Sequence, residues 1–467
     1  MNWISESDFT DELHHNAATK DLIKARVLID HLSDVSPDLQ RQVLSELDYC
    51  DPEFPAPLLG YLLALNSENL ALSREDLQMV LGNVLQKEPV HLIDLLVDIG
   101  TREAIDALIT RLGTDREIDQ KILDALAIIQ TEYALVKLIE TLDAPEAHTR
   151  NHGKILLTKI GVPALPILTQ NLEKNNTDTL IHTLNVLGTI GSEKSIRSIR
   201  NLLHNEPPDA NVRFAAYEAL GLLPVHKGAH ILASGLTDPD GMVRVAAAKA
   251  IEKNLDNTFI AGLKNLTRPK SRDTKQVASA LIDALADNVL LQLIDGPGFF
   301  TAMLDHLATE AHPDTRTHIE SLLRRKGQSE LADHIDAIAK KEDQTSGRLI
   351  YTVDDSRMIL SLYKTALFQI GCDVHLFEFP ERALEQIRQT KPDLVFTDLN
   401  MPGMTGIELT EAIRQHYPLD ELPIIMVTTQ SDGQDFSDAQ KAGISTIIQK
   451  PFTPEILSQI ISEFTRD

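Results

Sequence analysis

Four short apolar runs in the last quarter of the chain each end in polar side chains. These side chains are the acid pair Asp354-Asp355 after 349–353, Asp398 after 393–397, Thr428 after 423–427, and Lys450 after 446–449. Runs of this length and composition are typical of buried strands. In an open parallel α/β sheet, ligands bind at the edge formed by the carboxyl ends of the strands. The sequence therefore predicts that these side chains share one site.

The charges of this set indicate its chemistry. Three carboxylates that are brought together repel one another, so they share protons or hold a cation. Carboxylates combined with backbone carbonyls and waters suit Mg²⁺, which takes one or two protein carboxylates directly and leaves positions for phosphate oxygens. A lysine and a hydroxyl at the same edge would pair with a phosphoryl group. We therefore expect a site that holds a phosphoryl group on a carboxylate, a covalent intermediate that aspartate can form.

Residues from about 347 to 467 resemble the receiver domain of bacterial two-component response regulators. Four motifs carry the resemblance and occur in the expected order: the acid pair 354–355, a D-x-x-M-P-G stretch from Asp398, the strand-terminal Thr428, and a K-P-F stretch from Lys450. Four motifs in order are far more specific than any one of them. The alternative is a receiver-like fold in which the acids form only a solvated rim.

The resemblance implies a metal site and an acceptor. Asp398 would be the phospho-acceptor, and Asp355 and Asp398 would ligate Mg²⁺ directly. Asp354 would act on the metal through water, and the backbone carbonyl of Asn400 would complete the site. Autophosphorylation and dephosphorylation would then be the only reactions that the domain catalyses, so we do not expect an enzyme.

Two further residues are implied to contact the phosphoryl group. Thr428 would hydrogen-bond the acyl phosphate on activation, and Lys450 would pair with it. Receivers often carry an aromatic residue three positions before the lysine as the partner of the threonine, but this chain has Ile447 there. This departure leaves open how phosphorylation reaches the output face. Thr429 and Gln430 border the route of water to the phosphate and are expected to influence its lifetime.

Composition and charge limit the possible partners. The 467 residues are enough for two or more domains, and 43% hydrophobic with 24% charged residues is ordinary for a globular protein. The net charge is −25; residues 348–467 hold 10 basic and 18 acidic residues, a net charge of −8. Neither part offers the basic field that dominates binding to phosphate backbones, so we expect no nucleic-acid partner and no binding to anionic membranes.

The sequence also indicates a reducing compartment. Its two cysteines, Cys50 and Cys372, lie in different predicted domains, so neither a disulfide framework nor a cysteine-based metal site is expected. The first residues lack the basic start and apolar core of a signal peptide. No apolar run reaches about 18 residues, which predicts no membrane insertion. These features together predict a cytoplasmic protein.

A period of about 30 residues appears from position 87 onward. Ile99-Gly100, Ile129-Gln130, Ile160-Gly161 and Ile190-Gly191 recur at steps of 30 or 31. Each repeat contains two helical patterns, the second of which covers, for example, 118–129 or 180–190. Two helices per repeat predict an α-solenoid. The glycine after each second helix fits a position that needs positive φ.

Residues 87–255 resemble the short bacterial HEAT repeat, in which an acid-containing turn precedes a V-R-x-x-A-A-x-A-L helix. The Val-Arg pairs at 212–213 and 243–244 carry this resemblance. The alanines would allow neighbouring helices to approach closely, and each arginine would pair with the acid of its turn. The resemblance extends more loosely to 20–86 and 256–340. Some HEAT-like proteins are bilin lyases or DNA glycosylases, but nothing beyond the repeat points to either.

The domain organisation follows from these patterns. We expect an all-α HEAT-like solenoid over 1–340, a polar linker over 341–347, and a receiver over 348–467. Within the receiver, strands near 349–353, 373–377, 393–397, 423–427 and 446–449 alternate with helices near 356–370, 380–390, 406–416, 434–442 and 453–464. This alternation predicts a flavodoxin-like parallel sheet of order 2-1-3-4-5 with helices on both faces.

The pair His14-His15 does not share a helix face, so a metal site is not expected there.

The leading hypothesis is a phosphorelay protein. A histidine kinase would phosphorylate Asp398 with Mg²⁺, and the change would switch which proteins the HEAT surface or the receiver binds. The partner on the HEAT surface is left open. The alternative is a constitutive protein-binding scaffold with a non-signalling receiver, which Ile447 favours and the complete acid set disfavours. An enzyme that acts through the solenoid, such as a lyase, is the third hypothesis.

Overall fold

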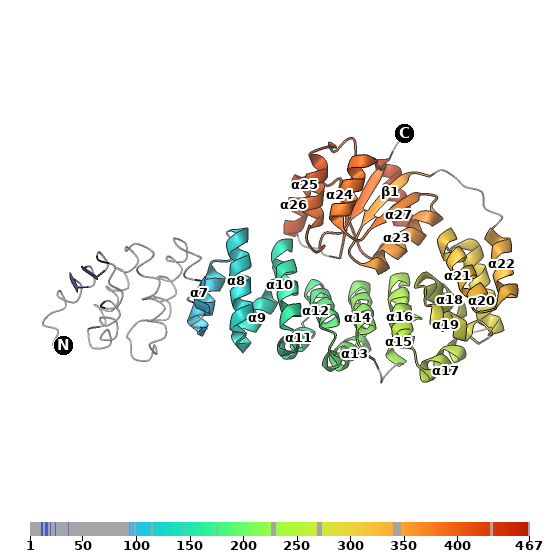
Figure 1. Ribbon diagram of the computed structural model, residues 1–467, viewed down its shortest axis with the longest axis horizontal. Helices are drawn as coiled ribbons and strands as arrows, with labels where there is room; N and C mark the ends of the chain where they lie inside the picture. Colours follow the sequence, from blue (N-terminus) through green and yellow to red (C-terminus); the bar gives the residue numbers. More distant parts are fainter. Residues whose placement is uncertain are drawn as a thin grey trace. The chain divides into compact units, whose positions relative to one another are not determined.

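The computed structural model describes residues 100–465 apart from 114, 145, 175, 226–229, 269–272, 340–346 and 430–432, together with scattered residues before position 100 (Figure 1). The chain falls into two compact units, Met1–Leu142 with His152–Ile160, and Asp143–Asn151 with Gly161–Asp467. The helices expected within 1–86, His14, Cys50, Gln430 and all of the expected linker except Gly347 lie outside the described residues. The domain limits 1–340, 341–347 and 348–467 remain predictions.

The described part of the first unit is helical. It contains α7 (Arg102–Thr110), α8 (Arg116–Ile129), α9 (Glu132–Glu140) and the residues of α10 (Ala147–Ile160) from His152 onward. The side chains of Thr101, Asp115 and Thr131 accept hydrogen bonds from first-turn amides of α7, α8 and α9, which satisfies part of each helix start. Helix α8 ends at Ile129, and the next residue, Gln130, has a left-handed φ of 50°. The predicted left-handed position is therefore present there, although glutamine occupies it.

The second unit continues the helical pairs. Its helices are α11 (Leu165–Asn171), α12 (Thr177–Ile190), α13 (Ile196–His204), α14 (Ala210–Leu222), α15 (His230–Gly235), α16 (Gly241–Lys253), α17 (Asn257–Leu266), α18 (Thr274–Asp283), α19 (Asp287–Leu293), α20 (Pro297–Thr309), α21 (Pro313–Arg325) and α22 (Ser329–Ala339). Helices α12, α14, α16 and α18 pack in succession. A Cβ added to Gly188 would lie 2.9 Å from Cα of Ala219, and one on Gly221 would lie 3.2 Å from Cα of Ala250. Small residues thus permit the close approach that the repeat pattern predicts.

The arginine of the Val-Arg pair connects successive repeats. The guanidinium of Arg213 donates to both carboxylate oxygens of Asp238, in the next turn, at 2.8 and 3.0 Å. The expectation that it pairs with the acid of its own turn is wrong, because Asp209 already caps α14 by accepting from two backbone amides. Arg244 donates to the backbone carbonyls of Asp238 and Pro239.

The second unit also holds a five-stranded parallel sheet in the order β2-β1-β3-β4-β5, as predicted. The strands are β1 (Leu349–Val353), β2 (Asp373–Phe377), β3 (Leu394–Thr397), β4 (Ile424–Thr428) and β5 (Thr446–Gln449). The helices between and after them are α23 (Arg357–Gln369), α24 (Pro380–Gln389), α25 (Gly406–Arg414), α26 (Gly433–Ala442) and α27 (Pro454–Phe464). The strand that ends in Thr428 includes this residue, one position beyond the predicted end.

Helices cover both faces of the sheet (Figure 1). On one face, Tyr363 of α23 and Leu457 of α27 belong to an apolar cluster with Phe396 of β3. On the other face, Leu409 of α25 belongs to a cluster with Val395 of the same strand. A strand that is buried on both faces reads as a continuous apolar run, which explains the sequence pattern. None of the helices that the structure describes is both long and apolar enough to cross a membrane.

Candidate functional site

The hydrogen-bond ladder of the sheet continues past the strand ends and fixes the residues that follow. The backbone amides of Asp354, Asp398 and Lys450 donate to carbonyls of the neighbouring strands β2, β1 and β4 at 3.1, 2.9 and 2.8 Å. The three side chains therefore leave the backbone at one edge of the sheet, where the sequence places a ligand site.

Lys450 connects the two central carboxylates. Its Nζ lies 2.6 Å from Oδ2 of Asp354 and 2.7 Å from Oδ1 of Asp398. The side chains of Lys450, Asp354 and Asp398 are 8%, 2% and 12% exposed. These pairs are therefore shielded from water. Charge-assisted hydrogen bonds are stronger in such shielded surroundings than in water. The structure thus brings together three of the residues predicted from the sequence.

The buried charges change the proton affinities of the site. Burial raises the pKa of Asp354 to about 7; Lys450 opposes this rise, while Asp398 and Asp355 add to it. For Lys450, burial works against the charged form, but Asp354 and Asp398 outweigh it and raise its pKa well above the usual value. Lys450 therefore stays protonated, whereas Asp354 exchanges its proton near neutral pH. An added positive charge beside Asp354 would stabilise its ionised form.

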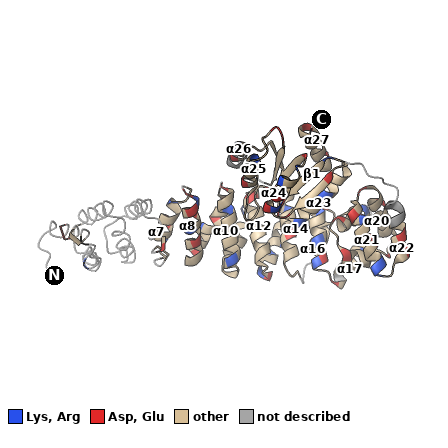
Figure 2. Ribbon diagram, turned by 45° about the horizontal axis from the view of Figure 1, so that its top comes forward, with Lys and Arg blue, Asp and Glu red and all other residues tan. Residues whose placement is uncertain are grey.

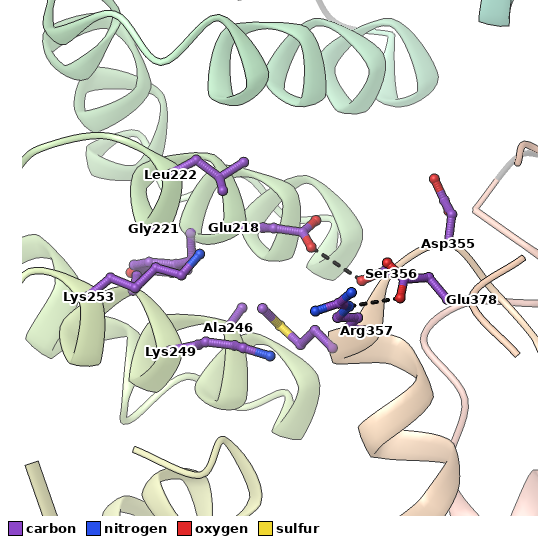
Figure 3. A pocket seen from close by; sticks show the side chains of 13 residues that line it. Glu218, Gly221, Leu222, Ala246, Lys249, Lys253, Asp355, Ser356, Arg357 and Glu378 are labelled. Carbon is purple, nitrogen blue, oxygen red and sulfur yellow. Dashed lines mark hydrogen bonds and ion pairs between the residues drawn. The ribbon is translucent and has the colours of Figure 1, made fainter. Parts of the chain in front are cut away.

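The chemistry of the donor set fits a hard cation such as Mg²⁺, since carboxylate and carbonyl oxygens are its preferred ligands. Asp354 and Asp398 lie together, and Asn400 is tied to Asp398 through its amide at 2.8 Å. Asp355 is exposed, and its carboxylate points away from Ser356 and Glu378 (Figure 3). Accordingly, no three His, Cys, Asp or Glu side chains in the described part of the chain are arranged to hold a metal.

Thr428 and Ile447 lie where the resemblance places the switch. Thr428 is buried at the end of β4, and its carbonyl accepts the Lys450 amide hydrogen bond. Ile447 pairs in register with Met426 and packs against the apolar cluster on the α24–α26 face. The position of the missing aromatic residue is therefore filled by ordinary apolar packing.

The loop after β3 depends on a glycine that the sequence interpretation did not single out. A Cβ on Gly406 would lie 2.1 Å from the backbone oxygen of Asp398, so no larger residue fits without moving that residue. Thr405 and Glu408 form a capping box that fixes the start of α25. The T-x-x-E pattern is a sequence signature that could have located this turn.

Helices α14 and α16 and the β1–α23 loop line a pocket of about 280 Å³ beside the site (Figure 3). All of these elements belong to the second compact unit. Glu218 on α14 accepts a hydrogen bond from the Ser356 hydroxyl at 3.3 Å. Arg357 pairs with Glu378 at 2.8 Å. Burial raises the pKa of Glu218 and lowers that of Lys249, both of which line the pocket.

Comparison with known protein families divides the chain into two matched regions. The model of the response regulator receiver domain matches residues 350–462. The model of HEAT repeats matches residues 165–252. Both matches agree with the parallel sheet and with the helical pairs described above.

Individual relatives match the receiver region. A chemotaxis protein CheY homolog of Campylobacter jejuni is 34% identical over 116 residues, which cover 24% of this chain and 89% of the relative. Chemotaxis protein CheY1 of Helicobacter pylori is 35% identical over 112 residues, covering 24% of this chain and 90% of the relative. The solved structure of Vibrio cholerae chemotaxis protein CheY4 has 28% identity and a TM-score of 0.25, covering 26% of this chain and 99% of that one.

Proposed function

Because this chain belongs to the response regulator receiver family and also carries HEAT repeats, we propose that it is a phosphorelay protein whose Asp398 accepts a phosphoryl group from a histidine kinase. The observation that carries the proposal is the position of Lys450, 2.6 Å from Asp354 and 2.7 Å from Asp398 at the carboxyl edge of the sheet. A protonated amine between two shielded carboxylates is suited to receive the oxygens of a phosphoryl group.

The transfer is a displacement at phosphorus. A carboxylate oxygen of Asp398 forms a bond to the phosphorus of a phosphohistidine, the P–N bond breaks, and its electron pair leaves on the histidine nitrogen. Lys450 and the Asn400 amide each contact one oxygen of Asp398, at 2.7 and 2.8 Å, and so orient the carboxylate. The Thr428 hydroxyl would donate to a phosphoryl oxygen. Mg²⁺, held by the carboxylates and the Asn400 carbonyl, would supply positive charge beside the transferring group.

The output of this protein is then a change in protein binding. Stacked helical repeats present extended surfaces that bind proteins or peptides. The strongly negative charge of the chain disfavours nucleic acid as the partner, and we infer a cytoplasmic protein that catalyses no reaction beyond its own phosphorylation and dephosphorylation.

A second candidate function is a constitutive scaffold with a non-signalling receiver. The observation in its favour is Ile447, which packs as an ordinary apolar residue where receivers often carry an aromatic one. In that case the acid set would not be phosphorylated, or its phosphorylation would leave partner binding unchanged.

Intact-mass measurement of the purified full chain tests the proposal. The protein is treated with phosphoramidate and Mg²⁺, beside the variants Asp398→Asn and Asp373→Asn. Asp373 is an exposed acid at the start of β2, at the opposite edge of the sheet, so it serves as the matched control. The wild type and D373N should gain one phosphate, and D398N should gain none. Equal gain in all three proteins, or gain in none, would contradict the proposal.

A further inference from the structure

Residues that hold the carboxylates of the site also contact side chains of the helical repeats. Lys450 is the first of them: its Nζ lies 2.7 Å from Asp398, and its backbone carbonyl accepts a hydrogen bond of 2.7 Å from Nδ2 of Asn211 on α14. Asn211 lies in the first turn of α14. Lys450 therefore links the Asp398 carboxylate to this helix start through a single residue.

Ser356 makes a second connection of the same kind. Its amide donates to Oδ1 of Asp354 at 2.9 Å, and its hydroxyl donates to Oε1 of Glu218 at 3.3 Å. In Figure 3 the Glu218 carboxylate points from α14 toward Ser356. Burial is the main cause of the raised pKa of Glu218; the Ser356 hydrogen bond and the charge of Lys450 lower this pKa, while the charge of Asp354 raises it. Ser356 thus connects the Asp354 carboxylate to a carboxyl group on α14.

Asn400 makes the third connection. Its amide donates to Oδ2 of Asp398 at 2.8 Å, and its side-chain oxygen accepts from Arg150 at 3.4 Å. Apolar contacts accompany these bonds, because Met242 at the start of α16 is buried in the cluster that covers the α23–α27 face of the sheet. Three separate loops of the site are therefore each bonded to the helical repeats.

We propose that α14 and its neighbours are the receiver's output surface within the same chain, and that a phosphoryl group on Asp398 weakens their contact with the site. This inference rests on the function proposed above and adds to it the element that changes. It also explains how the receiver signals with Ile447, because a direct contact at the site needs no aromatic switch in the sheet.

Charge sets the direction of the effect. A phosphoryl group adds negative charge and three acceptor oxygens at Asp398. Lys450 then reorganises toward the phosphoryl oxygens, which disturbs its bond to Asn211, and the added charge repels the Glu218 carboxyl. By linkage, if phosphorylation weakens the contact, then loosening the contact favours phosphorylation by the same factor.

Hydrogen exchange of the full chain, read by mass spectrometry, tests the coupling. The protein is measured with and without phosphoramidate and Mg²⁺, and the peptides that report are 209–213 and 354–357. Exchange in both should increase severalfold on phosphorylation of the wild type and stay unchanged in D398N. If the wild type gains phosphate but both peptides keep their exchange rates, the coupling is refuted while the phosphorelay function stands. If the wild type gains no phosphate, the proposed function itself fails, and the coupling fails with it.

Two variants test the contacts of α14 with the site separately, so that the test does not depend on a single substitution that could impair folding. Asn211→Ala removes one hydrogen bond of ordinary strength between α14 and Lys450, and the loss of such a bond shifts an equilibrium by roughly fivefold. The equilibrium for phosphorylation of N211A should therefore be about fivefold more favourable than that of the wild type. Asn201→Ala, an exposed position of α13, is its control and should match the wild type. Glu218→Gln keeps a hydrogen-bonding group but no charge, so phosphorylation should increase exchange less than in the wild type; Glu193→Gln is its exposed control. N211A and E218Q that both behave as the wild type would overturn the inference.

Discussion

Replacement of Asp354 by asparagine should stabilise the receiver sheet increasingly as the pH rises. The folded protein holds the Asp354 proton more tightly than the unfolded chain does, because burial raises its pKa to about 7. Below the unfolded pKa of about 3.9 this carboxyl is protonated in both states and its favourable contribution is complete. That contribution is lost as the pH rises through the folded value, because ionising the buried group opposes folding. Asparagine, which does not ionise, escapes this loss.

The size of the effect follows from the shift. A difference of about 3 pKa units at about 1.36 kcal/mol each corresponds to a loss of about 4 kcal/mol above pH 7. Only part of this loss is present at pH 5, so the advantage of D354N over the wild type should grow by roughly 2 to 3 kcal/mol between pH 5 and pH 8. Lys450 also contacts Asp398, at 2.7 Å, and the substitution leaves this partner in place.

Native-state hydrogen exchange of β1 and β3 peptides measures this difference. The wild type and D354N are compared at the same pH, so the intrinsic exchange rates cancel. The ratio of the observed exchange rates of the two proteins then gives the difference in their opening free energies. Asp373→Asn, at an exposed position, should show no comparable pH dependence. A ratio for D354N that stays constant from pH 5 to pH 8, or that falls, would refute the assignment of a buried, proton-sharing carboxyl at this position.

Three further substitutions test the packing. Gly406→Ala would place a Cβ 2.1 Å from the Asp398 backbone oxygen, so it should lower stability by about 2 kcal/mol in thermal unfolding. Gly262→Ala in α17, where an added Cβ would meet no atom within 4 Å beyond its own stretch of helix, should instead stabilise by up to about 1 kcal/mol, and a loss equal to that of G406A would contradict this reasoning. Arg213→Ala should cost about 2 kcal/mol, since it removes both hydrogen bonds to Asp238. In a double-mutant cycle with Asp238→Ala, the two losses should not add; additive losses would mean that the pair is not coupled.

The sheet could be predicted from the sequence because its signals are local. Buried strands read as short apolar runs, and the observed bounds of β1, β2 and β5 are those predicted, while β3 and β4 begin one residue later. The alternation of strands and helices predicted a parallel sheet, and the resemblance to receivers implied the flavodoxin-like order of its strands. The same reasoning predicted which residues meet at the carboxyl edge of the sheet, because each of them directly follows a strand or ends one.

The features that could not be predicted depend mostly on contacts between residues far apart in the sequence. Nothing near Asn211 or Glu218 indicates that these residues contact loops of the receiver, because that contact is made only when the helices and the sheet pack together. The partner of Arg213 lies in the following repeat and was assigned wrongly for the same reason. Gln130 shows a further limit: its left-handed backbone is set by the end of α8, although its residue type favours no such conformation.

The phosphoryl acceptor is tested most directly by trapping. The full chain is treated with phosphoramidate and Mg²⁺ and then with borohydride, which reduces an acyl phosphate of aspartate to homoserine and releases the phosphate. Peptide mass spectrometry then identifies the position of the change. We predict homoserine at position 398 and aspartate at Asp354 and Asp355. Homoserine at another position, or an unreduced residue 398 in protein that has gained phosphate, would contradict the assignment of Asp398 as the acceptor.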